Sequence, residues 1–149
     1  MTNVYFFILL GVVAGAMMPT QAGLNNKLSE ALGSPILAAL VSFFVGTAGL
    51  LIYAVVSGES VGNITSIKNA PPAAWFGGLL GAFFVTTAVV LVPRLGVAMS
   101  FSLIVAGQML VTLVIDHFGL LGVPVKEISA VRVAGIVMIT AGVILIRKF

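Results

Sequence analysis

The stretch LGVAMSFSLIVAGQMLVTLVI at residues 95–115 decides the fold, because it holds no charged residue and is long enough to cross a bilayer. A helix needs about 20 apolar residues to span a hydrocarbon core of about 30 Å. Residues 1–26, 31–58 and 69–93 form three further uncharged stretches. Of the 149 residues, 60% are hydrophobic and 7% are charged, against roughly 25% charged residues in soluble domains. The sequence therefore predicts an integral membrane protein and excludes a soluble enzyme, a coiled coil and a disordered tail.

These apolar stretches are predicted to be helices, because backbone groups in hydrocarbon must bond within a helix or a closed barrel. The alternating pattern of barrel strands is missing from them. We expect an all-α membrane protein with a single five-helix transmembrane domain over residues 1–149. Its spans are predicted at approximately 5–22, 35–56, 74–92, 97–117 and 128–146. The connections are predicted at residues 23–34, 57–72, 93–96 and 119–127.

The fifth span is the shortest, because only residues 133–146 are free of charge between Arg132 and Arg147. These residues cover about 21 Å at 1.5 Å per residue. Two interpretations of Arg132 are open. As an anchor, its side chain would extend to the membrane surface and lengthen the span. Alternatively, it would face a cavity and bind an anion.

The positive charges are nearly balanced across the membrane, since five spans place the two termini on opposite faces. The face of the N-terminus carries Lys68, Lys126 and Arg132, and the opposite face carries Lys27, Arg94, Arg147 and Lys148. Orientation normally follows an excess of Lys and Arg on the cytoplasmic side. A difference of one predicts insertion in both orientations, unless insertion machinery or one dominant helix fixes a single orientation.

A chain inserted both ways can form an antiparallel homodimer with its twofold axis in the membrane plane. Larger transporters build the same arrangement covalently from inverted repeats. Each copy would then be half of a ten-helix inverted-repeat transporter, and dimerisation would complete it.

Four motifs resemble a known family. They are PTQAGLN at residues 19–25, VPRLG at 92–96, AGQ at 106–108 and IDHFG at 115–119. Across essentially the whole chain the sequence resembles five-helix members of the drug/metabolite transporter superfamily, in the bacterial branch long labelled domain of unknown function 606. The resemblance implies a multi-pass protein of the bacterial inner (cytoplasmic) membrane, working as an antiparallel dimer or with a related paired subunit. It implies no particular substrate.

One departure limits what the resemblance implies. The small multidrug resistance transporters of the same superfamily carry a glutamate in the first helix that alternately binds a proton and a cation. No carboxylate lies in the first span of this chain. Export of polyaromatic cations through such a glutamate is therefore not expected.

Gln108 is the first candidate for substrate contact, because an unpaired amide near mid-span costs several kcal/mol in hydrocarbon. A hydrogen bond between helices would explain it equally. Thr112 and Asp116 follow at four-residue intervals and share its helix face. Asp116 is the candidate for proton coupling, since carboxyls buried in apolar surroundings have raised pKa values. Alternatively, Asp116 lies at the interface in a structural or capping role.

Gln21 and Asn25 form a second candidate pair near the end of the first span. In an antiparallel dimer they lie at the same depth as the partner's Asp116, which allows a cluster across the two subunits. The alternative is that Asn25 simply ends the helix in a loop.

Several positions are expected to shape or pack the helices. Pro19 should bend the first span and free a carbonyl near Gly15, giving a hinge or a backbone ligand. Small residues that let helix backbones approach closely occur at Gly11 and Gly15, at Gly77 and Gly81, and at Gly135 and Gly142. The last pair makes the fifth span a candidate dimer contact.

We expect no cofactor, no metal site and no nucleic-acid partner. The chain has no cysteine and one histidine, and its cations are scattered. No nucleophile–base set is visible, so an enzyme is not expected. The sequence favours a secondary-active exporter of a small organic solute, with a shared central cavity, alternating access and proton coupling through Asp116 as a hypothesis. Membrane lipid is the other expected partner. An ion channel and an accessory subunit without transport of its own are the alternatives.

Overall fold

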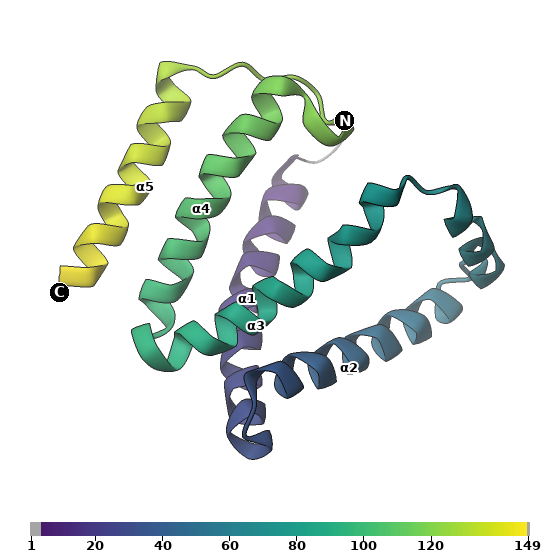
Figure 1. Ribbon diagram of the computed structural model, residues 1–149. Helices are drawn as coiled ribbons and strands as arrows, with labels where there is room; N and C mark the ends of the chain where they lie inside the picture. Colours follow the sequence, from purple (N-terminus) through teal and green to yellow (C-terminus); the bar gives the residue numbers. More distant parts are fainter. Residues whose placement is uncertain (1–3, 149) are drawn as a thin grey trace. The chain divides into compact units, whose positions relative to one another are not determined.

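The computed structural model describes residues 4–148, and this part of the chain contains helices and no strand (Figure 1). The α-helices are α1 (Val4–Leu32), α2 (Pro35–Val56), α3 (Phe76–Leu95), α4 (Val97–Phe118) and α5 (Ala130–Lys148). Short 3-10 helices are η1 (Val61–Asn69), η2 (Pro72–Trp75) and η3 (Leu120–Gly122). The prediction of an all-helical chain is confirmed.

Four helical segments are long and apolar enough to cross a membrane. They are Val4–Leu32, Pro35–Val56, Pro72–Leu95 and Val97–Phe118. The apolar part of α5, Ala130–Ile146, is shorter, as the sequence predicts for the fifth span. Large apolar side chains on the outside of these helices are exposed, Phe44 by 75% and Val131 by 81%. Such surfaces suit contact with lipid.

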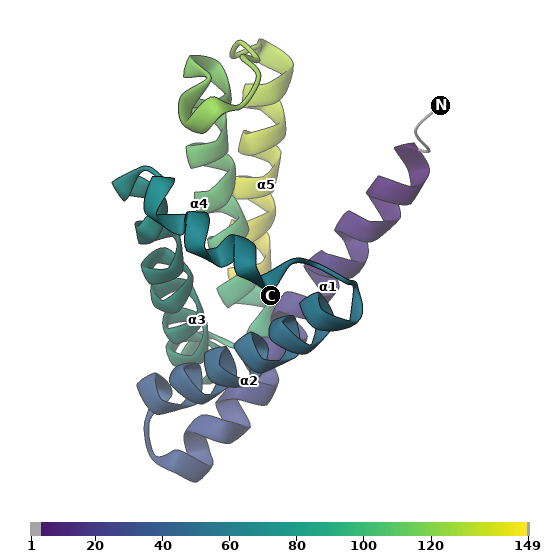
Figure 2. The same cartoon turned by 90° about the vertical axis from the view of Figure 1, so that its right-hand side faces the viewer.

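The chain divides into two compact units. The N-terminal unit, residues 1–93, contains α1, α2, η1, η2 and most of α3, and α1 packs against α2. The C-terminal unit, residues 94–149, contains α4, η3 and α5. In this unit α4 and α5 lie side by side (Figures 1 and 2).

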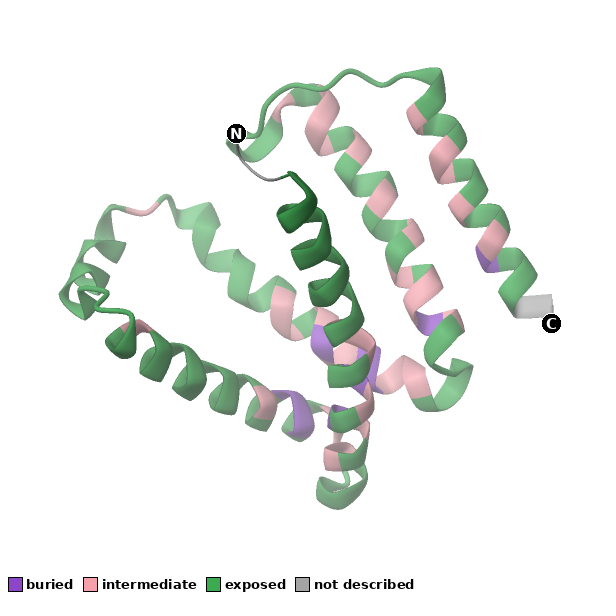
Figure 3. Ribbon diagram, turned by 180° about the vertical axis from the view of Figure 1, so that it is seen from behind, coloured by how far each residue is buried: buried purple, intermediate pink, exposed green. Residues whose placement is uncertain are grey.

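Small side chains form the buried part of the N-terminal unit (Figure 3). Its buried residues are Ala22 and Asn25 of α1, Ala38 and Ala39 of α2, and Val85, Ala88 and Val89 of α3. A Cβ added at Gly81 of α3 would lie 3.5 Å from Cζ of Phe43 of α2, which is ordinary van der Waals contact. Around Gly11, Gly15 and Gly77 an added Cβ would meet nothing within 4 Å. Within the described part of the N-terminal unit these three glycines make no close helix contact.

The two glycines of α5 lie on its side toward α4. Gly135 lines a groove with Met109 and Thr112, and Gly142 lines a second groove with Ala98 and Phe101. Neither glycine would place an added Cβ within 4 Å of another residue. This side of α5 is directed toward α4 within the same chain, so the prediction of a dimer contact through Gly135 and Gly142 gains no support here.

The first helix is longer than the predicted span, and α1 continues through Pro19 to Leu32. The segment after Gly23, predicted as a connection, is therefore helical. It contains no further proline, and Nδ2 of Asn26 donates to Oε1 of Glu30 one turn later, at 3.0 Å. Such pairs stabilise a helix. The connection shrinks to Gly33, with a φ of +68°, and Ser34.

The predicted turn at residues 93–96 is also mostly helical. Pro93 lies inside α3, which ends at Leu95, and Gly96 makes the turn into α4 with a φ of +76°. A proline near the end of a helix removes only one backbone hydrogen bond. The left-handed backbone that reverses the chain therefore falls on the glycine instead.

Gly119, which ends α4, is a position where a side chain should be strongly unfavourable. Its φ is +59°, and an added Cβ would lie 2.7 Å from Cγ2 of Val125. We expect Gly119→Ala to lower the free energy of unfolding by about 1–2 kcal/mol from the backbone conformation alone. Circular dichroism during titration with sodium dodecyl sulfate measures this loss. Gly142→Ala is the control, because alanine is favoured by about 0.5–1 kcal/mol in a helix interior, so equal losses would contradict the prediction.

Candidate functional site

A mainly apolar groove that also contains amide and hydroxyl side chains lies between α1 and α2 within the N-terminal unit. The groove has a volume of about 540 Å³ and is lined by Val13, Ala16, Met17, Thr20, Gln21, Leu24, Asn25 and Ser42. A smaller groove of about 210 Å³ adjoins it, lined by Gln21, Ser42, Phe43, Gly46, Thr47 and Leu50. Gln21 and Ser42 line both, so we name the two together the α1–α2 groove. The predicted pair Gln21 and Asn25 lies in it.

Asn25 is the most unusual residue of the α1–α2 groove. It is only 5% exposed, and its Nδ2 has no hydrogen-bond partner within the described residues. An unsatisfied buried polar group costs about 1–3 kcal/mol. The adjacent Asn26, by contrast, donates its Nδ2 hydrogen to Glu30. Asn25 lies within α1, so the alternative that it ends the helix is wrong.

The threonine hydroxyls of the groove donate hydrogen bonds to backbone carbonyls of their own helices. The hydroxyl of Thr20 donates to the carbonyl of Ala16 at 3.0 Å, and that of Thr47 donates to the carbonyl of Phe43 at 2.8 Å. A hydroxyl that donates in this way keeps lone pairs that accept hydrogen bonds. The groove is therefore lined by two amide side chains of α1, Gln21 and Asn25, beside hydroxyl acceptors. No charged residue lines it.

A second polar cluster joins the end of α4 to the start of α5. Nη2 of Arg132 forms an ion pair with Oδ2 of Asp116. Nη1 of Arg132 donates to the carbonyl of Lys126 at 2.8 Å, and the Lys126 amide donates to the carbonyl of Asp116 at 2.8 Å. Nδ1 of His117 accepts the Ile128 amide hydrogen at 3.3 Å. These bonds hold the loop after α4 against the two helix ends.

The pairing of Arg132 with Asp116 adds a contact that neither sequence interpretation of Arg132 includes. One guanidinium nitrogen is paired with a carboxylate of the same unit, and both the anchor and the anion-binding interpretation stay predictions. The side chains are 33% and 29% exposed, so the pair is partly shielded from solvent. The sequence does contain a sign of this ion pair, because a negative charge lies at the end of the fourth predicted span and a positive charge lies near the start of the fifth, across a short loop.

Of the three candidates predicted on one face of α4, the structure directs only two toward α5. Thr112 and Asp116 are both directed toward α5, where Thr112 lines a groove of about 180 Å³ with Arg132. Gln108 is exposed and lines none of the grooves described here. Its amide forms no hydrogen bond within residues 94–148. A partner for Gln108 must therefore come from outside the C-terminal unit.

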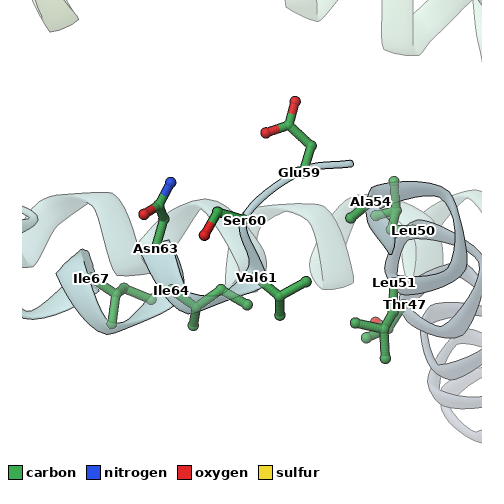
Figure 4. Close-up of a pocket in the computed structure, with 10 residues that line it drawn as sticks. All are labelled: Thr47, Leu50, Leu51, Ala54, Glu59, Ser60, Val61, Asn63, Ile64 and Ile67. Atoms are coloured by element: carbon green, nitrogen blue, oxygen red, sulfur yellow. The ribbon is translucent and has the colours of Figure 1, made fainter. Parts of the chain in front are cut away.

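Another groove, of about 580 Å³, has a different character (Figure 4). It is formed by the end of α2 and by η1. Val61, Ile64 and Ile67 are spaced by three residues, the repeat that aligns side chains along a 3-10 helix. Figure 4 shows Glu59 and Asn63 pointing away from this apolar row. An amphipathic segment of this kind suits the membrane interface better than a polar solute.

Comparison with known proteins agrees with the helical and apolar character of the chain. A family model described as "Putative inner membrane exporter, YdcZ" matches residues 6–145. No curated protein and no solved structure matches the chain. The match covers nearly the whole sequence, including both polar clusters. The protein is therefore an inner-membrane protein with apolar helices able to span the bilayer, and the chain belongs to the DMT_YdcZ family.

Proposed function

We propose that the protein is a secondary-active exporter of a small organic solute, and that the α1–α2 groove forms part of its binding site. The observation that carries the proposal is the buried, unpartnered amide of Asn25. Such a group is costly unless something outside the chain satisfies it. Because this nitrogen is closed to solvent in the structure, a solute would reach it only after the helices around Asn25 move apart, as alternating access requires. Membership of an exporter family supports the direction of transport.

We further propose that two copies work as an antiparallel homodimer with a shared central cavity and alternating access, as in members of the drug/metabolite transporter superfamily. Three features favour a second copy. The cations are nearly balanced between the two faces. Gln108 lacks a partner in its own unit, and the glycines Gly11, Gly15 and Gly77 are open to close approach.

Proton coupling through Asp116 belongs to the same proposal. A proton on the Asp116 carboxylate would remove the negative charge that holds Arg132. The loop would then lose one of its ties to the helix ends, which would ease a rearrangement of its remaining bonds. The cluster predicted between Gln21, Asn25 and the partner's Asp116 requires this release, because Asp116 is engaged with Arg132 in the structure.

Flux through proteoliposomes tests the proposed function. Vesicles with the wild-type chain are given a bacterial metabolite extract with and without a proton gradient, and accumulated solutes are identified by mass spectrometry. We expect at least one solute to accumulate with saturation and counterflow. Asn25→Leu should lower its uptake about tenfold, since tenfold corresponds to about 1.4 kcal/mol. Asn26→Leu is the matched control and should leave uptake unchanged.

The rival functions give different results in the same vesicles. An ion channel conducts large currents that do not saturate at millimolar solute, and it shows no counterflow. An accessory subunit gives no flux at all without its partner. An enzyme would convert a component of the extract rather than move it. Any of these three results would contradict the exporter.

A further inference from the structure

The groove of about 580 Å³ between the end of α2 and η1, which we name the α2–η1 groove, is mostly apolar and lies where a candidate membrane span ends. We propose that it holds one acyl chain of an anionic phospholipid, whose phosphate group is bound by Lys68 at the end of η1. The segment η1 would then lie in the membrane interface beside α2. This inference goes beyond solute export and does not depend on it.

The wall formed by α2 continues the exposed apolar surface of that helix. Four residues of α2 line the groove at the three- and four-residue spacing that shares one helix face: Thr47, Leu50, Leu51 and Ala54. Leu50 and Leu51 are exposed. The hydroxyl of Thr47 donates to the carbonyl of Phe43 at 2.8 Å, so its proton is already bonded. This wall therefore presents a surface that suits hydrocarbon.

The wall formed by η1 is the apolar side of an amphipathic segment. Val61, Ile64 and Ile67 form one row along the 3-10 helix, and Figure 4 shows them pointing to the same side of it. Thr65 and Lys68 belong to the next row, because each residue turns such a helix by about one-third of a circle. An amphipathic helix of this kind lies in the membrane interface with its apolar face toward the acyl chains.

Aromatic side chains mark the depth of η1 in the membrane. Tyr53 lies in the last turn of α2, before η1, and Trp75 ends η2, after it. Both side chains are exposed. Tyr and Trp gather where the headgroups meet the hydrocarbon, because one part of the ring system is apolar and another is polar. The chain on both sides of η1 is therefore expected at this depth, where phosphates and acyl chains are both within reach.

The dimensions of the groove suit a single acyl chain. The chains of one leaflet fill half of a hydrocarbon core of about 30 Å, which is about 15 Å. The row from Thr47 to Ala54 rises about 10 Å at 1.5 Å per residue. The row from Val61 to Ile67 rises about 12 Å at 2.0 Å per residue. One acyl chain is therefore long enough to follow either wall over its whole length.

The charges at the two ends of η1 indicate where the headgroup lies. Lys68 is exposed and directly follows Ile67, the last residue of the apolar row. Glu59 precedes η1 and points away from this row in Figure 4. The nine residues of η1 separate the two charges by about 18 Å, against a screening length of about 8–10 Å in physiological salt. The lysine should therefore attract a lipid phosphate with little opposition from the carboxylate.

Spin labels on single cysteines test what covers the groove, since the chain has no cysteine of its own. Ile64→Cys places a label on the apolar row, Asn63→Cys on the side that points away from it, and Phe44→Cys on the exposed surface of α2. The full chain is placed in vesicles of phosphatidylcholine and phosphatidylglycerol. Electron paramagnetic resonance then measures how readily each label meets oxygen, which concentrates among acyl chains, and a water-soluble nickel chelate.

We expect the labels at residues 64 and 44 to be reached by oxygen and protected from nickel, and the label at residue 63 to be reached by nickel. Protection of residue 64 from both reagents would show that protein, such as a second copy, covers the groove. Access for nickel would show that water or a polar solute fills it. Either result overturns the proposal. Val61→Cys, on the same row, should repeat the result of Ile64→Cys, which guards against a local effect of one label.

Retained lipid tests the headgroup. The full chain is purified with equal amounts of phosphatidylglycerol and phosphatidylcholine, and native mass spectrometry identifies the first lipid retained. We expect phosphatidylglycerol to exceed phosphatidylcholine about fivefold, the effect of about one lysine near an anionic surface. Lys68→Gln should abolish this excess. Lys126→Gln removes a lysine from the same predicted face and should leave it unchanged. Equal retention in the wild type, or an excess that survives Lys68→Gln, would overturn the proposal.

Discussion

Arg132→Gln is expected to lower the free energy of unfolding by about 1–3 kcal/mol. The substitution removes the guanidinium from Asp116 and also removes its bond to the carbonyl of Lys126. Asp116 would be left as an unpaired carboxylate at the end of a membrane helix. A fully buried broken pair costs more, but each partner here is about one-third exposed, so water recovers part of the loss. Unfolding in sodium dodecyl sulfate, followed by circular dichroism, gives the measurement.

A double-mutant cycle separates the pair from the rest of the loop. Asp116→Asn should lose a similar amount, and the double variant should lose clearly less than the sum. Lys126→Gln is the control, because the backbone of Lys126 joins the cluster through both its amide and its carbonyl. It should change the stability by less than about 0.5 kcal/mol. Additive losses for Asp116→Asn and Arg132→Gln would mean that the ion pair contributes nothing.

Some elements could be predicted closely because local chemistry marks their ends. The sequence predicts the second span at residues 35–56, and α2 is Pro35–Val56. Ser34 caps it, since its hydroxyl oxygen accepts the Leu37 amide hydrogen at 3.3 Å, and Pro35 suits a first helical turn. The sequence predicts the fourth span at residues 97–117, and α4 ends one residue later, at Phe118. Glycines lie on both sides of it.

Other features depend on packing between distant segments and could not be predicted. The extension of α1 beyond Ala22 carries polar residues, so hydropathy alone ends the span too early. Burial of Asn25 arises only once α1 meets the other helices of its unit. The partnership of Arg132 with Asp116 requires the loop between them to fold back on the helix ends. Periodicity within one helix contains none of this information.

Orientation should respond strongly to a few added charges, because the wild-type balance is three cations against four. Reporters active only inside or only outside the cytoplasm are fused to the C-terminus. We expect both to be active in the wild type. Ser60→Lys with Ser66→Lys raises the N-terminal face to five against four. It should shift the reporter ratio about tenfold toward an external C-terminus.

The opposite pair of substitutions is the matched control. Ala31→Lys with Leu32→Lys adds two cations at the exposed end of α1, on the other face, and should retain the C-terminus in the cytoplasm. Arg132 is counted on the N-terminal face although it pairs with Asp116 in the folded structure. Activity from only one reporter in the wild type would rule out the antiparallel homodimer.

Joint expression of the two charge variants then tests whether orientation matters for transport. If the working unit is antiparallel, each variant alone supplies copies of one orientation and should lose most of the flux. Expressed together, they restore both orientations and should recover it, although neither sequence has regained its original charges. A stability defect from the added lysines could not produce this recovery, because it would persist in the mixture. Full flux from either variant alone would instead require a parallel assembly or a single working chain, and the shared cavity would have to be abandoned.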